Sequence, residues 1–371
     1  MSAMPSKPRI AVVLPVFNGE KYIAEAVASV LAQTFRDFEL AIVDDGSTDG
    51  TGEILSGIRD PRMRVVRFPE NRGLVEALNA GIRETESELI ARMDADDISQ
   101  PRRFERQVAF LDAHPEVGIC GGWMRKFGDD ASLTSPPGGH EEIRAALFFC
   151  FGMAHPTVMM RRAVLDGHGL LYKDEFRYAE DLDLFIRAAE ATRAANLREV
   201  LLMNRAHCEE VSAARERETI EATIRVLRPQ LRLLMPGVTP QEEELHFRLL
   251  LGEADTESLA SAEQWLLRLD RANLERGRYD SAAFRDHLRD VWLRVHLQAR
   301  SGRLAAVASY SHSPLASIGE TGLAAWAGKA RRMGHVGLAN GKRALRVAIG
   351  PYLPSGGPGS RGDGAAPGSH S

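Results

Sequence analysis

The sequence predicts an α/β protein with a mixed, mostly parallel sheet, helices on both faces and a helical extension after it. Three observations support this fold class. Short β-branched apolar runs alternate with amphipathic helical runs in the first half of the chain, several apolar runs end in polar clusters, and strand signals stop after about residue 216. Strands that alternate with helices form parallel sheets, whose buried strands are continuously apolar.

The first half of the chain contains four strand-like runs. Residues 9–17 (RIAVVLPVF) are apolar and too few for a buried helix, so they predict an inner strand. Apolar pairs at helical spacing follow between Tyr22 and Leu31. Further strands are expected at 38–43, 63–68 and 88–93, and further helices at 74–85 and 101–113, where Pro101 is in the first turn.

From Gly118 the alternation becomes less regular, and SPPGG at 135–139 predicts a surface loop. Thr239 to Glu242 has the pattern of a capping box with proline in the first turn, and Leu-rich helices should follow to about Leu304. Residues 351–371 are Gly, Pro and Ser with almost no apolar side chain, which predicts a disordered tail. The remaining elements are strands at 118–127, 155–162 and 197–205 and helices at 141–149 and 181–191.

The composition excludes several classes of protein. A net charge of -4 argues against general nucleic-acid binding. Three scattered cysteines support neither a zinc site nor a disulfide framework and fit a reduced, cytoplasmic setting. The N-terminus lacks an apolar signal core, and no apolar run approaches the ~20 residues of a membrane span.

Polar clusters follow three of the predicted strands. They are Pro15–Glu20 after the first strand, Asp44–Asp49 after the second and Asp94–Asp97 after the fourth. Ligands bind at the carboxyl ends of parallel strands, so these clusters should share one edge of the sheet. Either acidic motif alone is more often a turn, but their joint occurrence in one βαβ series favours a site.

Three carboxylates in Asp94-Ala-Asp-Asp97 repel one another unless a cation lies among them. Mg²⁺ and Mn²⁺ take one or two carboxylates and complete their coordination with water and substrate phosphates. Asp94 and Asp96 point the same way on an extended strand end. A nucleoside diphosphate is therefore the expected ligand, and metal bound to it makes it a better leaving group.

Two other nucleotide sites are not supported. The first βα turn, Val16-Phe-Asn-Gly-Glu20, has one glycine and not the GxGxxG of a dinucleotide-binding domain, and no GxxxxGK[ST] occurs.

The segments VVLPVFNGEKYIAEAVASVLAQTFRDFELAIVDDGSTDGT, NRGLVEALNAGI and ARMDADD together resemble the family 2 glycosyltransferases, which have the Rossmann-like GT-A fold. The resemblance covers residues 8–215, which we take as the catalytic domain, followed by a helical extension at 216–350. It implies transfer of a sugar from a nucleotide-sugar donor to an acceptor hydroxyl, with inversion and with Mg²⁺ or Mn²⁺.

The resemblance also implies roles for single residues on the donor side. Asp45 should accept a hydrogen bond from the base, uracil or thymine, and Asp94 should lie near the ribose and the metal. Arg92 is expected either at the donor phosphates or sugar, or in a surface ion pair. Residues Pro15, Phe17 and Glu20 should border the nucleotide, and the metal ligands should be Asp96 and Asp94, with His207 as a further candidate.

Glu180 and Asp181 resemble the family's Glu-Asp motif at a helix start. A single inverting displacement needs a base for the acceptor proton, and we assign Asp181, with Glu180 as second choice. A helix N-terminus should lower the pKa of this carboxylate and keep it ionised. A capping role is the alternative. His155 is interpreted as a structural histidine, whereas His207 is left open between a metal or phosphate contact and a structural role.

The processive members' QxxRW motif is absent, so a single-addition enzyme is implied, acting on a cell-surface glycan or its lipid-linked precursor. The basic stretch 329–349 is either a solvated face or a peripheral contact with the inner face of the plasma membrane. Two alternative functions stay open: a nucleotidyltransferase, and a catalytically inactive nucleotide-sugar-binding protein.

Overall fold

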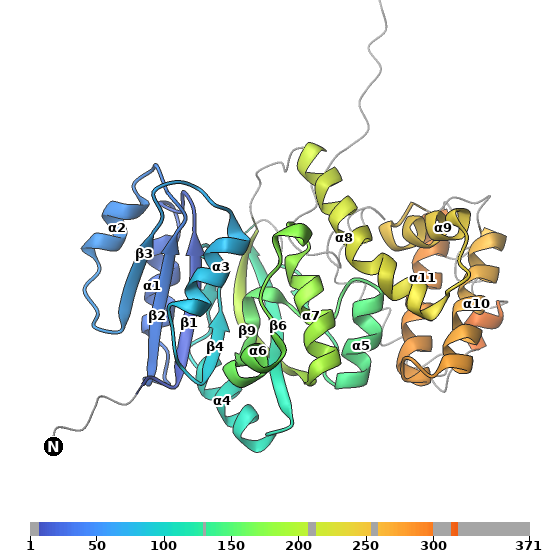
Figure 1. The fold of residues 1–371 in the computed structure, drawn as a ribbon, viewed down its shortest axis with the longest axis horizontal. Helices are drawn as coiled ribbons and strands as arrows, with labels where there is room; N and C mark the ends of the chain where they lie inside the picture. The colour runs from blue at the N-terminus through green and yellow to red at the C-terminus, as the bar shows by residue number, and fades with distance from the viewer. Residues whose placement is uncertain (1–6, 129–130, 207–212, 254–258, 300–312, 318–371) are drawn as a thin grey trace, which may run out of the picture.

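The structure is a computed structural model, shown in Figure 1, and it describes residues 7–128, 131–206, 213–253, 259–299 and 313–317. The predicted α/β architecture is confirmed. A central sheet is flanked by helices, and a group of helices formed by the later part of the chain packs at one end of it. Across these residues no helix is both long and apolar enough to cross a bilayer.

The sheet is mixed. The strands β1 (Ile10–Val16), β2 (Phe38–Asp44), β3 (Met63–Arg67) and β4 (Leu89–Arg92) are mutually parallel where they pair. β8 (Met159–Arg161) lies antiparallel between β4 and β6 (Val117–Gly128), and β9 (Arg193–Ala206) runs parallel to β6. The order is β3-β2-β1-β4-β8-β6-β9-β5, where β5 is Ile98–Ser99, and β7 (Leu133–Thr134) pairs with β6.

Alternate side chains of β1 pack on opposite faces of the sheet. Val12 belongs to an apolar cluster with α1 (Ile23–Leu31) and α4 (Arg103–Ala113). Val13 belongs to another cluster with α3 (Leu74–Arg83). Because both faces are covered, the strand is apolar throughout. The other helices before β9 are α2 (Thr51–Gly57), α5 (His140–Phe148), α6 (Arg162–His168) and α7 (Glu180–Ala191), with 3₁₀ turns η1 (His155–Thr157) and η2 (Asp174–Phe176).

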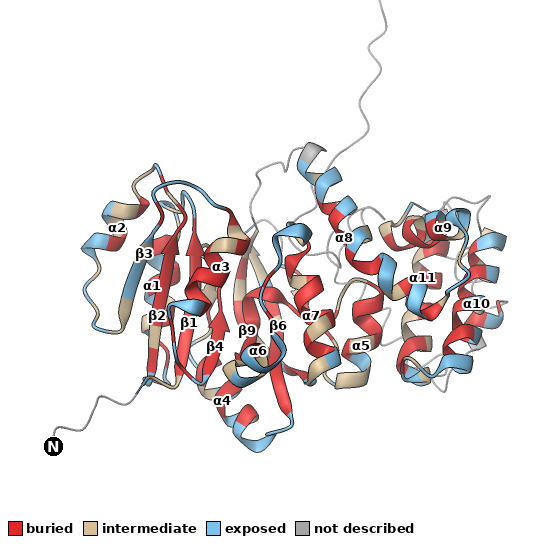
Figure 2. Ribbon diagram, viewed as in Figure 1, coloured by how far each residue is buried: buried red, intermediate tan, exposed pale blue. Residues whose placement is uncertain are grey.

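The helices after β9 bury their apolar faces toward one another and toward α5 and α7 (Figure 2). The predicted capping box is confirmed, since Thr239 Oγ1 accepts from the Glu242 N–H at 3.3 Å and Glu242 Oε2 accepts from the Thr239 N–H at 2.9 Å. The helices are α8 (Ala213–Leu234), α9 (Pro240–Leu251), α10 (Leu259–Arg276), α11 (Ser281–Ala299) and α13 (Pro314–Ser317).

Several sequence predictions need correction or stay open. The strand predicted at 155–162 is wrong in its first residues, because His155-Pro156-Thr157 forms a 3₁₀ turn and only Met159–Arg161 pairs. α2, α6, β5 and β7 were not predicted. The division at residues 215/216 remains a prediction, and the tail 351–371 and the basic stretch 329–349 lie outside the described residues.

Candidate functional site

The ends of β1 and β2 meet at the carboxyl edge of the sheet, where Val16 pairs with Asp44. The loops that follow are joined by hydrogen bonds, from Asn18 N–H to Ser47 Oγ at 2.9 Å and from Gly50 N–H to Glu20 Oε2 at 2.8 Å. Two of the expected nucleotide contacts, Phe17 and Glu20, are exposed here, and Phe17 is 48% exposed. The third, Pro15, is buried within β1.

Asp45 is buried and holds the loop that leads into α3. Its Oδ1 accepts from the Arg72 N–H at 2.7 Å, and its Oδ2 accepts from the Gly73 N–H at 2.9 Å. Gly46 makes this packing possible, because its φ is +73° and a Cβ there would lie 2.4 Å from the Glu70 carbonyl carbon. Asp45 thus has a structural task beside the base contact, which remains a prediction.

The acidic run after β4 forms a compact cluster. One carboxylate oxygen from each of Asp94, Asp96 and Asp97 lies within 4.8 Å of the others. Asp97 Oδ1 accepts from Asn204 Nδ2 and from the Arg205 N–H, both at 3.0 Å, whereas its buried Oδ2 has no hydrogen-bond partner among the described residues. Burial and the two neighbouring carboxylates raise the pKa of Asp97 well above its usual range. An all-oxygen cluster with an unpartnered oxygen fits Mg²⁺ or Mn²⁺.

Arg92 lies at the base of this cluster and is 1% exposed. Its Nη1 donates to Asp94 Oδ2 at 2.6 Å. The alternative of a surface ion pair is therefore wrong, because the guanidinium is buried, although its partner Asp94 is 24% exposed. Arg103 lies beneath and donates to the Arg92 carbonyl at 2.8 Å, and burial lowers the pKa of Arg103 to about 9. Contact of Arg92 with a donor remains a prediction.

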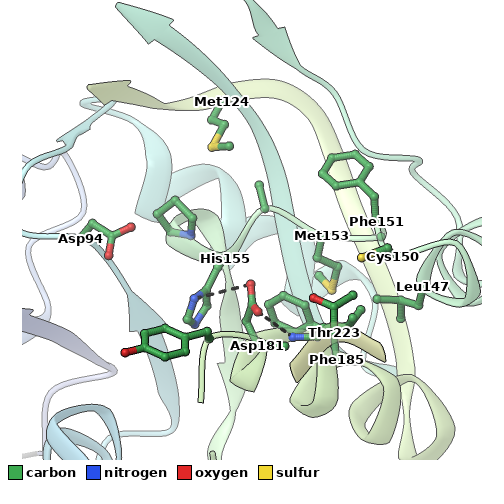
Figure 3. Close-up of a pocket in the computed structure, with 16 residues that line it drawn as sticks. Asp94, Met124, Leu147, Cys150, Phe151, Met153, His155, Asp181, Phe185 and Thr223 are labelled. Atoms are coloured by element: carbon green, nitrogen blue, oxygen red, sulfur yellow. Dashed lines mark hydrogen bonds and ion pairs between the residues drawn. The ribbon is translucent and has the colours of Figure 1, made fainter. Parts of the chain in front are cut away.

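One pocket contains both the acidic strand end and the start of α7 (Figure 3). Asp94, His155 and Asp181 line its polar side, and Met153, Leu182 and Phe185 are among its apolar lining. Asp94 and Asp181 therefore converge on one pocket, although they are far apart in sequence. The Asp181 side chain is 28% exposed, and its Oδ1 accepts from the Leu182 N–H at 2.8 Å.

The predicted direction of the Asp181 pKa is wrong. Burial raises the pKa of Asp181 above its ordinary value, and this effect outweighs the Leu182 N–H bond and the Arg92 charge, which lower it. Glu180 is more deeply buried, and desolvation together with the neighbouring Asp181 raises its pKa to about 7. Both carboxylates are therefore protonated more readily than in water.

Backbone strain gathers at the same places. Within the described ranges, the non-glycine residues with positive φ are Asn18 (52°), Cys150 (79°) and Tyr178 (74°). Asn18 follows β1, and Cys150 and Tyr178 line the pocket. Left-handed backbone at such residues costs about 1–3 kcal/mol and tends to occur at functional sites.

Sequence reasoning did not assign roles to Asp97, Tyr172 or Arg205. Asp97 had a signal in the acidic run itself, but Tyr172 and Arg205 had none, since their parts depend on packing. Arg205 donates from Nε to the Asp96 carbonyl at 3.0 Å. His207, the further metal candidate, lies outside the described residues.

Comparison with known proteins identifies the class. Residues 11–169 match the model of Glycosyl transferase family 2. The putative glycosyltransferase EpsE of Bacillus subtilis is 34% identical over 209 residues, which are 53% of this chain and 73% of EpsE. The succinoglycan biosynthesis protein ExoU of Rhizobium meliloti is 34% identical over 196 residues, which are 48% of this chain and 56% of ExoU.

Two solved structures share the fold. S. aureus TarS 1–349 in complex with UDP-GlcNAc has a TM-score of 0.54 at 19% identity and covers 81% of this chain and 88% of TarS 1–349. The mannosyltransferase PcManGT from Pyrobaculum calidifontis, in complex with GDP-Man and Mn²⁺, has a TM-score of 0.52 at 19% identity and covers 93% of this chain and 86% of PcManGT.

The order of the mixed sheet and the likeness to TarS 1–349 show the GT-A fold. The chain belongs to the family 2 glycosyltransferases, as its relatives and the family model show. This membership removes the nucleotidyltransferase alternative.

Proposed function

We propose that the protein is an inverting, divalent-metal-dependent glycosyltransferase that uses a UDP- or dTDP-linked sugar. The observation that carries this proposal is that Asp94 belongs to the acidic cluster and also lines the pocket that contains Asp181. A metal-bound donor and a base would then lie at the same pocket. PcManGT, which is complexed with GDP-Man and Mn²⁺, and TarS, which is complexed with UDP-GlcNAc, support the donor class.

Asp94 and Asp96 would hold Mg²⁺ or Mn²⁺, with Asp97 beside them and His207 as a further candidate. The ion, when bound, neutralises the diphosphate and makes it a better leaving group. Arg92 holds Asp94 in place from below. The loops of Phe17, Glu20 and Asp45 would hold the nucleoside at the neighbouring strand ends.

Asp181 is the proposed base, with Glu180 as second choice. The acceptor oxygen forms a bond to the anomeric carbon, the bond from that carbon to the diphosphate oxygen breaks on the opposite side, and the acceptor proton passes to Asp181. This single displacement inverts the anomeric centre. A pKa raised by burial suits a base, since it brings proton affinity closer to the operating pH.

The acceptor would be a growing polysaccharide or its lipid-linked precursor, as the name of the succinoglycan biosynthesis protein ExoU suggests for this relative. A cytoplasmic location, with residues 329–349 at the inner face of the plasma membrane, would bring the enzyme to such an acceptor.

Thermal shift against nucleotide sugars with Mn²⁺ would identify the donor, and transfer and donor-hydrolysis assays would then test the mechanism. Asp96→Ala should lose Mn²⁺-dependent donor affinity, and Asp181→Asn should bind donor normally but lose turnover by at least about a hundredfold. Asp166→Ala, which changes an exposed aspartate on α6, is the control. Wild-type protein that binds UDP with Mn²⁺ but neither transfers nor hydrolyses any donor would favour the inactive binding protein.

A further inference from the structure

His155 connects the proposed base to the interior of the protein. Its Nδ1 lies 3.8 Å from Asp181 Oδ2 (Figure 3). Its Nε2 lies 2.8 Å from the Tyr172 hydroxyl. The side chain is 4% exposed, yet it borders the pocket. Nδ1 has no hydrogen-bond partner within the described ranges. A buried polar atom of this kind costs free energy unless a partner is supplied.

The surroundings fix the protonation of the ring. Burial, together with the Arg92 charge, lowers the pKa of His155 well below its usual range, so the imidazole is neutral and carries one N–H. Tyr172 is buried, and His155 Nε2 is the hydrogen-bond partner of its hydroxyl. If the hydroxyl donates to Nε2, the ring proton is on Nδ1 and faces the Asp181 carboxylate. The opposite tautomer would leave a lone pair against a carboxylate and a buried hydroxyl proton without its acceptor.

The position of Tyr172 is itself fixed from α3. Asn79 Oδ1 accepts from the Tyr172 N–H at 3.0 Å, and Asn79 Nδ2 donates to the Tyr172 carbonyl at 2.8 Å. Phe185 of α7 packs edge-on against the His155 ring, with the centroids 5.8 Å apart. The imidazole therefore has little freedom, and its Nδ1–H has a defined direction.

We propose that His155 is a positioning residue for Asp181: its Nδ1–H at Oδ2 and the Leu182 N–H at Oδ1 fix the orientation of that carboxylate for proton transfer. This inference rests on the proposed function, in which Asp181 is the base. The distance of 3.8 Å exceeds a hydrogen bond, and contacts of this kind shorten when the reacting groups are bound.

Steady-state kinetics on single variants test the direction of the ring proton. His155→Leu should lower kcat roughly tenfold to hundredfold, a part of the 10²–10⁴ that general base catalysis contributes, with donor KM changed less than twofold. His155→Asn places an amide N–H close to the position of Nδ1 and should recover most of kcat. His155→Gln places its amide near Nε2 and should not. Equal activity of the Asn and Gln variants would overturn the proposal.

A double-variant cycle separates positioning from general loss of structure. In the Asp181→Asn background, His155→Leu should reduce kcat no further, because the group that it orients is gone. The matched control is His246→Leu, which should leave kcat unchanged. His246 is also a buried histidine, but it lies in α9, where its Nδ1 accepts from Trp265 Nε1 at 3.3 Å. Loss of the same factor in both backgrounds would overturn the proposal.

The proposed function fails by a different result. If Asp181→Asn keeps wild-type kcat, Asp181 is not the base, whatever His155→Leu does. If Asp181→Asn is inactive and His155→Leu keeps wild-type kcat, the proposed function stands and the positioning role is wrong. Tyr172→Phe provides a milder check, since it removes the hydroxyl that selects the tautomer and should lower kcat less than His155→Leu.

Discussion

The buried guanidinium of Arg92 forms an ion pair with the partly exposed carboxylate of Asp94, in which Nη1 lies 2.6 Å from Oδ2. Burial raises the pKa of Glu180 and of Asp181, which lie on α7, and the Arg92 charge opposes this rise. One guanidinium therefore provides positive charge both to the acidic cluster and to the carboxylates at the start of α7. It reduces the repulsion between Asp94 and Asp181, which line the same pocket.

Replacing Arg92 tests whether its charge compensates the surrounding carboxylates. Arg92→Met should lower the free energy of unfolding by about 1–3 kcal/mol, because the carboxylate of Asp94, which is 24% exposed, loses its charged hydrogen-bond donor. Added Mn²⁺ should restore part of this loss, giving a larger thermal shift in the variant than in wild type. Urea denaturation with and without MnCl₂ measures both. Arg64→Met, on an exposed arginine paired with exposed Glu84, should cost no more than about 1 kcal/mol. Equal cost for the two variants would contradict this account.

Asp45→Asn tests both the structural role of Asp45 in its loop and its predicted contact with the base of the donor. The variant replaces one carboxylate oxygen with an NH₂ group, which cannot accept from the Arg72 or the Gly73 N–H, so it should lose about 1–3 kcal/mol of stability. Titration with UDP and with GDP should show weaker binding of both. A loss confined to stability would remove Asp45 from the donor site, and a loss larger for UDP would support the predicted base contact. Asp37→Asn, just before β2, is the control.

A single methyl group at residue 46 should disrupt the same loop. Gly46→Ala combines a left-handed φ with a backbone contact of 2.4 Å, so the loop around Glu70 must shift. The variant should lose at least about 1–3 kcal/mol from the strained φ alone, and its donor affinity should fall with it. Gly57→Ala, where an added Cβ meets nothing within 4 Å, should be neutral. Circular dichroism melts and donor titration distinguish the two variants. Normal donor binding by Gly46→Ala would contradict the proposal that the loop of Asp45 holds the nucleoside.

Stability should depend on pH through Glu180. Its pKa is about 7 in the folded protein and 4.5 ordinarily. Between these values the folded protein retains a proton that the unfolded chain has released, so the free energy of unfolding falls as pH rises. Glu180→Gln removes this loss and should be more stable than wild type by up to about 3 kcal/mol at pH 8, with almost no gain at pH 4.

Denaturation with urea at pH 4, 5.5 and 8 measures the difference. Glu53→Gln, which changes an exposed glutamate in the first turn of α2, is the control. A difference between Glu180→Gln and wild type that stays constant over this range would show that Glu180 ionises normally.

Much of the fold was predictable because its inner strands are buried on both faces. β1, β2 and β4 appear in the sequence as short continuous apolar runs, which few other structures produce. β5 and β7 have two residues each and therefore no period to detect. Near β8, Pro156 and the preceding histidine form a 3₁₀ turn that an apolar pattern does not distinguish from a strand.

The site was only partly predictable for a related reason. The acidic run after β4 can be recognised because its residues are adjacent in the sequence. It follows a strand of a parallel sheet, so it is expected at the carboxyl edge of that sheet. The direction of the Asp181 pKa depends on the depth of burial, and the contact of His155 with Tyr172 and Asp181 depends on three segments packing together. Neither the depth of burial nor this contact can be inferred from residues that are adjacent in the sequence.

The apolar interior is continuous from Val13 in β1 to Leu315 in α13. α5 packs against α11, and α7 packs against α8, so the layer that presents Asp181 is shared by both parts of the molecule. Calorimetry should accordingly give one endotherm, and cutting the chain after β9 would expose apolar side chains of α7, the helix that carries Asp181.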